Sequence, residues 1–287
     1  MKGKCNNRHC ICTGHYHNDR HGKIPTLQSR TVVTAFLLIS ATCVLSASAL
    51  ADQKWGHLEV TIRYDGPPVK TRYFDTRNPD IKVADERIVV NPENKGLRNV
   101  AVYLRNKSPV PIHPSFKKLA KEDVVVHMKD RRIAPHVFGL WTEQRLLFLN
   151  GDGHGYNPVV QTFRNPPVSF LIKPNKDYRY EYSTFEHIPS PISCSVHPWM
   201  NAYAIIRDNP YVSISDKNGF VSLRHLPAGE HQIQFWHETA GYISSVNIDG
   251  VASEWTRGRL NVNVLPNKTI KLGVVKVPSA AFEKDEP

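Results

Sequence analysis

The sequence predicts an all-β protein built from two successive β-sandwiches. Apolar and polar residues alternate in many short runs, which is the pattern of half-buried strands, and no sustained helical stripe of apolar residues is present. Turn-forming residues, 21 Pro and 16 Gly among 287, separate these runs. The chain is long enough for two domains and apolar enough to bury a core.

Residues 1–51 are expected to be a secretory signal with a long basic start. Lys and Arg residues precede the apolar run VVTAFLLISATCVLSASA, which ends in Ala49-Leu50-Ala51, a small-x-small cleavage pattern before Asp52. The run is too short and too rich in Ser and Ala for a good membrane span. We therefore expect an exported protein, in the periplasm, outside the cell or on its surface, with no span left after cleavage.

The first sandwich, with its N-terminal strands, is predicted over residues 52–207. Residues 115–123 are predicted to hold a short helical turn. The expected strands are 57–64, 99–105, 123–129, 135–141, 145–150, 167–172, 178–185 and 201–208.

The second and smaller antiparallel sandwich is predicted over residues 208–278, with a flexible tail at 279–287. A hairpin turn is expected at Asp216 to Gly219. Tyr211, Phe235 and Trp236 are expected in its core, and His237 is interpreted as a histidine bonded to a neighbour within the sandwich. The expected later strands are 231–237, 242–248, 259–264 and 270–277.

The charge of the chain gives no sign of nucleic-acid binding. The whole sequence carries +11, but residues 1–51 hold six of the 37 basic residues and one of the 26 acids, so 31 basic and 25 acidic residues and a net charge of +6 remain. These charges are scattered rather than gathered in a basic patch.

Cysteine use singles out one residue. Cys5, Cys10, Cys12 and Cys43 all lie in the predicted signal, where the Cys/His cluster lacks the paired spacing of a zinc finger. Cys194 is the only cysteine after residue 51, so it has no disulfide partner within the mature chain. A lone exported thiol is prone to oxidation unless it is buried or bound to a metal.

The segment CSVHPWM places three candidate metal ligands, Cys194, His197 and Met200, within seven residues. Thiolate and thioether ligands favour copper, and a type 1 copper centre takes a cysteine, two histidines and a weak axial methionine. The second histidine must come from an earlier strand turn. The alternative interpretation of Cys194 is a buried thiol at a strand end.

This segment resembles the ligand loop of cupredoxins of the short amicyanin type, Cys-x-x-His-Pro-aromatic-Met. The block from Cys194 to Tyr242 is similar to secreted methylamine-utilisation-like proteins, and the likeness extends over most of 55–277. The resemblance implies a Greek-key cupredoxin sandwich followed by a small sandwich like the prealbumin and carboxypeptidase regulatory domains. It also implies Cys194 as the strong equatorial ligand, His197 as the exposed imidazole and Met200 as the axial ligand of copper.

The fourth ligand is ambiguous. The family pattern Asn-x-Asp-x-x-x-His-Asn aligns with NGDGHGYNP, which puts Tyr156 at the histidine position and His154 two residues earlier. Either the turn shifts and His154 binds copper, which the flanking glycines would ease, or Tyr156 replaces it, or no competent site forms. His136 is the reserve ligand, with a buried, hydrogen-bonded histidine near the site as its alternative role.

The predicted function is a type 1 copper protein that carries single electrons to and from a redox protein that the sequence does not name. The alternative is a degenerate module that binds Cu(I), or that recognises a cell-surface polysaccharide or protein without redox chemistry. No Ser-His-Asp order, paired carboxylates, phosphate-binding loop or His-x-His pair is found after residue 51. We therefore do not expect an enzyme.

Overall fold

The computed structural model describes residues 55–76, 78, 80–106 and 109–283. The predicted signal, with its four cysteines, and residues 284–287 of the predicted tail lie outside these ranges. The described chain consists of strands, with a few short 3-10 turns, so the predicted all-β class is confirmed. Within these residues no helix is long and apolar enough to cross a bilayer.

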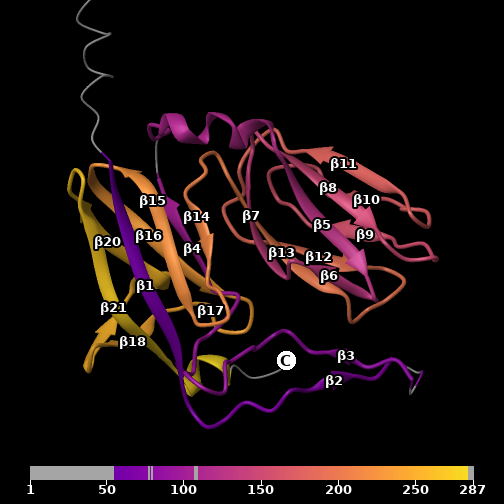
Figure 1. Ribbon diagram of the computed structural model, residues 1–287, viewed down its shortest axis with the longest axis horizontal. Helices are drawn as coiled ribbons and strands as arrows, with labels where there is room; N and C mark the ends of the chain where they lie inside the picture. The colour runs from indigo at the N-terminus through magenta and orange to yellow at the C-terminus, as the bar shows by residue number, and fades with distance from the viewer. Residues whose placement is uncertain (1–54, 77, 79, 107–108, 284–287) are drawn as a thin grey trace, which may run out of the picture. The chain divides into compact units, whose positions relative to one another are not determined.

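The first sandwich consists of two facing sheets (Figure 1). One has the order β10-β9-β12-β13-β7 and the other β11-β8-β5-β6. Both are mixed, because β13 runs parallel to β7 and β5 parallel to β8. The bounds are β5 (Asp123–Lys129), β6 (Arg132–Ala134), β7 (Val137–Trp141), β8 (Arg145–Asn150), β9 (Pro158–Val160), β10 (Val168–Ser169), β11 (Asp177–Glu181), β12 (Ser190–Cys194) and β13 (Asn201–Arg207).

Alternating side chains of these strands meet in one core. Val126 and Met128 point inward from β5, and Phe148 from β8 packs beside them. Cys194 and Met200 belong to the same buried cluster. The candidate ligands therefore lie where the core of the first sandwich reaches its loops.

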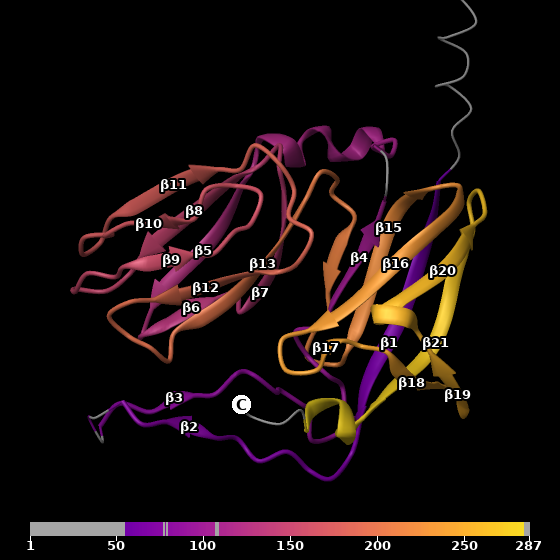
Figure 2. The same ribbon diagram turned by 180° about the vertical axis from the view of Figure 1, so that it is seen from behind.

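The second sandwich pairs the sheet β15-β1-β21-β18-β19 with the sheet β14-β4-β16-β17, to which β20 adds beside β16 (Figure 2). The predicted turn from Asp216 to Gly219 is confirmed, since the Gly219 N–H donates to the Asp216 carbonyl. Gly219 has φ +75°, and a Cβ at this position would lie 1.9 Å from the Ile62 carbonyl oxygen, so the turn requires glycine. The bounds are β1 (Trp55–Asp65), β4 (Ala101–Arg105), β14 (Val212–Ile214), β15 (Phe220–Pro227), β16 (Gly229–His237), β17 (Gly241–Tyr242), β18 (Ser245–Ile248), β19 (Val251–Glu254), β20 (Arg259–Val264) and β21 (Thr269–Pro278).

The strand pairing differs from the predicted division of the chain at Arg207. β1 and β4 were expected in the first sandwich, but β1 pairs with β15 and β21, and β4 pairs with β14 and β16. Because β1 runs parallel to β21, the prediction of a purely antiparallel second sandwich is wrong. Leu58 and Val102 accordingly lie in the core that also holds Phe235. Alternation identifies a strand, but its sheet partners lie more than a hundred residues away and leave no local signal.

The remaining elements lie in connections between the strands of the sandwiches, or after the last strand. The predicted helical turn at 115–123 is present as two 3-10 turns. Between β1 and β4 the chain forms a long arm, residues 66–96, which contains the small ladder of β2 and β3. Two further 3-10 turns lie near the end of the described chain. The bounds are β2 (Tyr73–Phe74), β3 (Val83–Ala84), η1 (Pro114–Lys117), η2 (Leu119–Lys121), η3 (Thr256–Gly258) and η4 (Ser279–Phe282).

Candidate metal centre

Three of the predicted ligands lie on the hairpin loop that joins β12 to β13. These strands are antiparallel neighbours, with Ser193 opposite Asn201. The Cys194 N–H donates to the Met200 carbonyl at 3.2 Å, and the Met200 N–H donates to the His197 carbonyl at 2.9 Å. The backbone thus closes the loop on itself and fixes where its side chains start.

The soft donors of this loop are shielded from water. Cys194 is 2% exposed and Met200 is 1% exposed. The Cys194 Sγ lies 3.8 Å from the His197 Nδ1. With metal bonds of about 2.3 Å to sulfur and about 2.0 Å to nitrogen at a tetrahedral angle, two ligating atoms lie about 3.5 Å apart. The observed separation is therefore close to what one shared metal ion requires.

The second loop of the site, residues 151–157, is held by Asn150 at the end of β8. The Asn150 side-chain amide donates to the carbonyls of His154 at 2.7 Å, Lys173 at 3.0 Å and Ile172 at 3.2 Å, and its Oδ1 accepts from the Asp152 N–H. Sequence reasoning did not identify this role. The asparagine before Gly-Asp-Gly is a signal for such a side-chain-bonded turn.

His154 carries an unused nitrogen into the site. Its Nε2 is buried and makes no hydrogen bond, although the Asp152 carboxylate lies 3.8 Å away. Its ring centroid is 5.6 Å from that of His197. A buried imidazole nitrogen without a hydrogen-bond partner is uncommon, and it is the donor type that copper takes.

Tyr156 is fully buried beside both histidines, with its ring centroid 4.8 Å from that of His154 and 5.3 Å from that of His197. Its hydroxyl donates to Asp152 and accepts from the Arg131 N–H. Burial, and then the bond to Asp152, raise the pKa of the phenol above its ordinary value. Tyr156 is therefore a neutral phenol whose hydroxyl is already hydrogen-bonded within the loops.

The electrostatics of the site favour a neutral imidazole at His197. Burial lowers the pKa of His197, and the nearby His154 and Arg131 lower it further. Burial alone would raise the pKa of Asp152, but hydrogen bonds from Tyr156 and from the backbone of the 130–131 turn outweigh it and lower that pKa. A neutral imidazole is the form that binds a metal.

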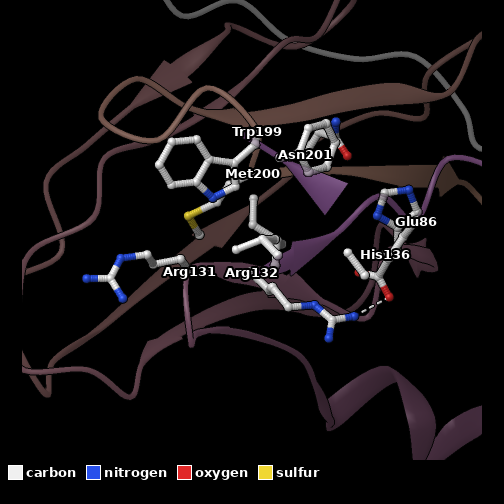
Figure 3. Close-up of a pocket in the computed structure, with 11 residues that line it drawn as sticks. Glu86, Arg131, Arg132, His136, Trp199, Met200 and Asn201 are labelled. Carbon is white, nitrogen blue, oxygen red and sulfur yellow. Dashed lines mark ion pairs between the residues drawn. The ribbon is translucent and has the colours of Figure 1, made fainter. Parts of the chain in front are cut away.

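The arm covers the Met200 side of the loop (Figure 3). A cavity of about 10 Å³ separates them, which is barely room for one water molecule. An ion pair between Glu86 of the arm and Arg132 of β6 closes one edge. The residues around the cavity are Phe74, Val83, Ala84, Glu86, Arg131, Arg132, Ile133, His136, Trp199, Met200 and Asn201.

His136 lines this cavity, but it does not join the other candidate ligands. Its Nε2 is bound to the Glu238 carboxylate of the second sandwich, and both side chains are buried. This is the hydrogen-bonded alternative considered for His136. Its position links the second sandwich to the edge of the site.

The donor set fits copper in kind: one thiol, one thioether and two imidazoles, one of which has an orphaned buried nitrogen. Cys194, His197 and Met200 are brought together by one loop, and His154 and Tyr156 approach His197 from the facing loop. Within the described ranges, no three His, Cys, Asp or Glu side chains are already arranged closely enough to hold a metal ion. Binding by His154 would therefore require a small movement of its ring.

Comparison with known proteins gives partial structural similarities only. No protein-family model and no curated protein sequence matches the chain. Among solved structures, it is similar to a copper-containing nitrite reductase from Thermus scotoductus SA-01, with 20% identity over 34% of this chain and 27% of that one and a TM-score of 0.28. It is also similar to amicyanin from Paracoccus versutus, with 12% identity over 37% of this chain and 97% of that one and a TM-score of 0.27. Similarities this low assign no family, and the all-β fold is established by the strand pairing.

Proposed function

We propose that the chain is an exported type 1 copper protein that carries single electrons. The observation that supports this most directly is the 3.8 Å approach of the Cys194 thiol to the His197 imidazole on one hairpin loop. Met200 is buried on the same loop, and the orphaned nitrogen of His154 lies on the loop opposite. We propose these four residues as the ligands, with Tyr156 beside them.

Bound copper would supply a one-electron couple at this position. The chain would contribute a fixed frame. The hairpin holds Cys194 and His197 through its backbone bonds, and Asn150 holds the loop of His154. Because Cys194 and His197 already lie close together and only the ring of His154 would have to move on binding, little rearrangement would accompany electron gain or loss, and burial of Met200 would keep water out.

The test is a spectrum of the copper-loaded protein. We expect an intense visible band from thiolate-to-copper charge transfer and a narrow copper hyperfine splitting in EPR. Cys194→Ser and His154→Ala should abolish both signals. His187→Ala, which alters an exposed histidine at the opposite end of the sandwich, is the matched control and should leave them unchanged. A colourless protein after loading with Cu(II) would refute the proposal.

The burial of Tyr156 supports a second candidate function, a module that binds Cu(I) without transferring electrons. In this case Cys194, His197 and Met200 alone would hold the ion, and Tyr156 with its bond to Asp152 would occupy the place of the missing ligand. Such a protein would compete with a Cu(I) chelator but show no blue band. In this case the substitution Tyr156→His should create the blue band. If His154 is a ligand, the unsubstituted protein should already show the band.

A further inference from the structure

Four basic residues lie on segments next to the loop of His154. We define Lys129, Arg131, Lys173 and Lys176 as the basic rim. The three lysines are exposed and Arg131 is half-buried. Lys129 ends β5 and Arg131 lies in the turn that follows it, whereas Lys173 and Lys176 lie in the turn before β11, far away in the sequence.

Hydrogen bonds place both turns against the site. The Arg131 N–H donates to the Tyr156 hydroxyl, and the side chain of Lys129 lies 3.3 Å from where a Cβ of Gly151 would be. On the other side, Asn150 binds the Lys173 carbonyl through its side chain and the Lys176 carbonyl through its N–H. Asn150 also binds the His154 carbonyl, so the rim and the site share one anchor.

The charge of the rim is largely uncompensated. None of its four side chains takes part in an ion pair within the described part of the chain. Figure 3 shows the contrast with Arg132, whose guanidinium meets Glu86 while that of Arg131 points away. Of the two nearby acids, Asp152 is already bonded to Tyr156 and to backbone N–H groups. This leaves Asp130 as the one free carboxylate among these turns.

The opposite end of the sandwich is basic as well, but part of its charge is neutralised. There Asp123 accepts from Arg145 at 2.8 Å and from Arg179 at 3.4 Å, while the exposed Lys117 and Lys118 take part in no ion pair among the described residues. At the site end, two apolar side chains are exposed: Val196 on the loop of His197 is 56% exposed, and Leu171, beside Gly155 and two residues before Lys173, is 65% exposed. Exposed apolar side chains near charged ones are typical of a protein-binding surface, and we call these two the apolar centre.

We propose that this surface docks an acidic redox protein, one that presents clustered carboxylates around its own redox centre. This inference rests on the proposed electron-carrier function and names the chemical class of the partner. The basic rim would attract the carboxylates and orient the encounter, since complementary charges raise association rates more than affinity. The apolar centre would then bring His197 against the partner.

The first test measures electron transfer to small probes of opposite charge. Hexacyanoferrate(III) takes one electron from the reduced copper protein and becomes hexacyanoferrate(II); tris(phenanthroline)cobalt(III) likewise becomes the cobalt(II) complex. We expect the rate with the anionic probe to fall as ionic strength rises, and the rate with the cationic probe to rise. Lys173→Glu with Lys176→Glu should slow the anionic probe about tenfold at low salt. Lys117→Glu with Lys118→Glu, an equal charge change on η1 and the residue after it at the far end, should leave that rate nearly unchanged.

A second measurement does not depend on copper. The paramagnetic, redox-inert anion hexacyanochromate(III) should broaden NMR amide signals of residues 129–131 and 173–176 in the metal-free protein, and poly-L-glutamate should shift the same signals. Uniform broadening, or equal effects of the two variant pairs, would overturn the docking proposal. Broadening by the small anion without any response to poly-L-glutamate would indicate a small-anion site and would also overturn it. A colourless protein with selective responses to both probes would refute electron transfer while leaving the acidic partner supported.

Discussion

The two sandwiches bury histidines in contrasting ways. In the first, His154 and His197 sit on loops at the end of the core, and the Nε2 of His154 is buried without a hydrogen bond. In the second, His237 lies on β16 and is fully buried; its Nδ1 accepts from the Thr239 N–H, and its Nε2, like that of His154, has no hydrogen-bond partner. On the loops, His197 lies beside the Cys194 thiol and the ring of His154, whereas His237 in its strand meets the ring of Phe282.

The contrast shows how position decides the role of an imidazole. A histidine within a strand is enclosed by core side chains on a fixed backbone, and burial simply favours its neutral form. On a loop, a small movement of the ring can bring its nitrogen to a shared point with donors from another loop. The four predictions that follow, from the largest expected effect to the smallest, test this difference.

The largest effect concerns the pH dependence of stability. Burial, with a contribution from His136, lowers the pKa of His237 to about 3. The unfolded chain takes up a proton below its ordinary pKa of about 6.5, so the free energy of unfolding should fall as pH drops from there toward 3, by up to about 5 kcal/mol in total. His237→Gln removes the group that takes up this proton, so the free energy of unfolding should depend less on pH. Urea unfolding of both proteins at several pH values measures this difference. Parallel profiles for the two proteins would contradict a buried neutral His237.

Truncating one aromatic residue in each core compares the two sandwiches directly. Phe148 and Phe235 are both fully buried, in separate clusters. Phe148→Ala and Phe235→Ala should each cost about 3–5 kcal/mol. Because a third buried cluster, with Tyr103, Val137 and Trp236 among its members, contains strands of both sandwiches, we expect calorimetry to show one shared unfolding transition. Two transitions, each lowered by one variant alone, would show that the sandwiches unfold independently.

The anchor of the His154 loop gives a smaller effect. Asn150→Ala removes the side-chain hydrogen bonds to three carbonyls. Those of Ile172 and Lys173 still accept from the Tyr156 and Lys176 N–H groups, whereas that of His154 loses this partner, and we expect the free energy of unfolding to fall by about 2 kcal/mol. If the proposed copper site forms, its affinity for copper should fall as well, since the loop of His154 is no longer held. Asn263→Ala, at an exposed position on β20, is the control and should change stability by less than about 0.5 kcal/mol. Unchanged stability for Asn150→Ala would show that this loop needs no anchor.

The smallest expected effect is at the arm. Glu86→Gln weakens the pair with Arg132, whose side chain is 43% exposed against 18% for Glu86. Exposed pairs contribute about 0–1 kcal/mol, so thermal unfolding should change little, and less at high salt. If the free energy of unfolding falls by well over this range, the ion pair, rather than the apolar contacts of Val83 and its neighbours, holds the arm over Met200.

Several elements were predictable from the sequence alone. The strands at 123–129 and 145–150 are present with the predicted bounds, because each is a short apolar run between polar residues. The strands β9 and β12 were not predicted: they are short, and Pro158 and Pro191 weaken the strand signal. The expected core positions of Tyr211, Phe235 and Trp236 are confirmed.

What the sequence by itself determined was the β class, through alternation, and the grouping of Cys194, His197 and Met200, since three residues on one short loop cannot lie far apart. Only the tertiary structure decided that β1 pairs with β21, that Asn150 ties His154 to the loop of Lys173, and that Tyr156 bonds to Asp152 beside His197. These relations join segments distant in the chain. They depend on the packing of whole sheets, whose energy is summed over many contacts and appears in no local pattern.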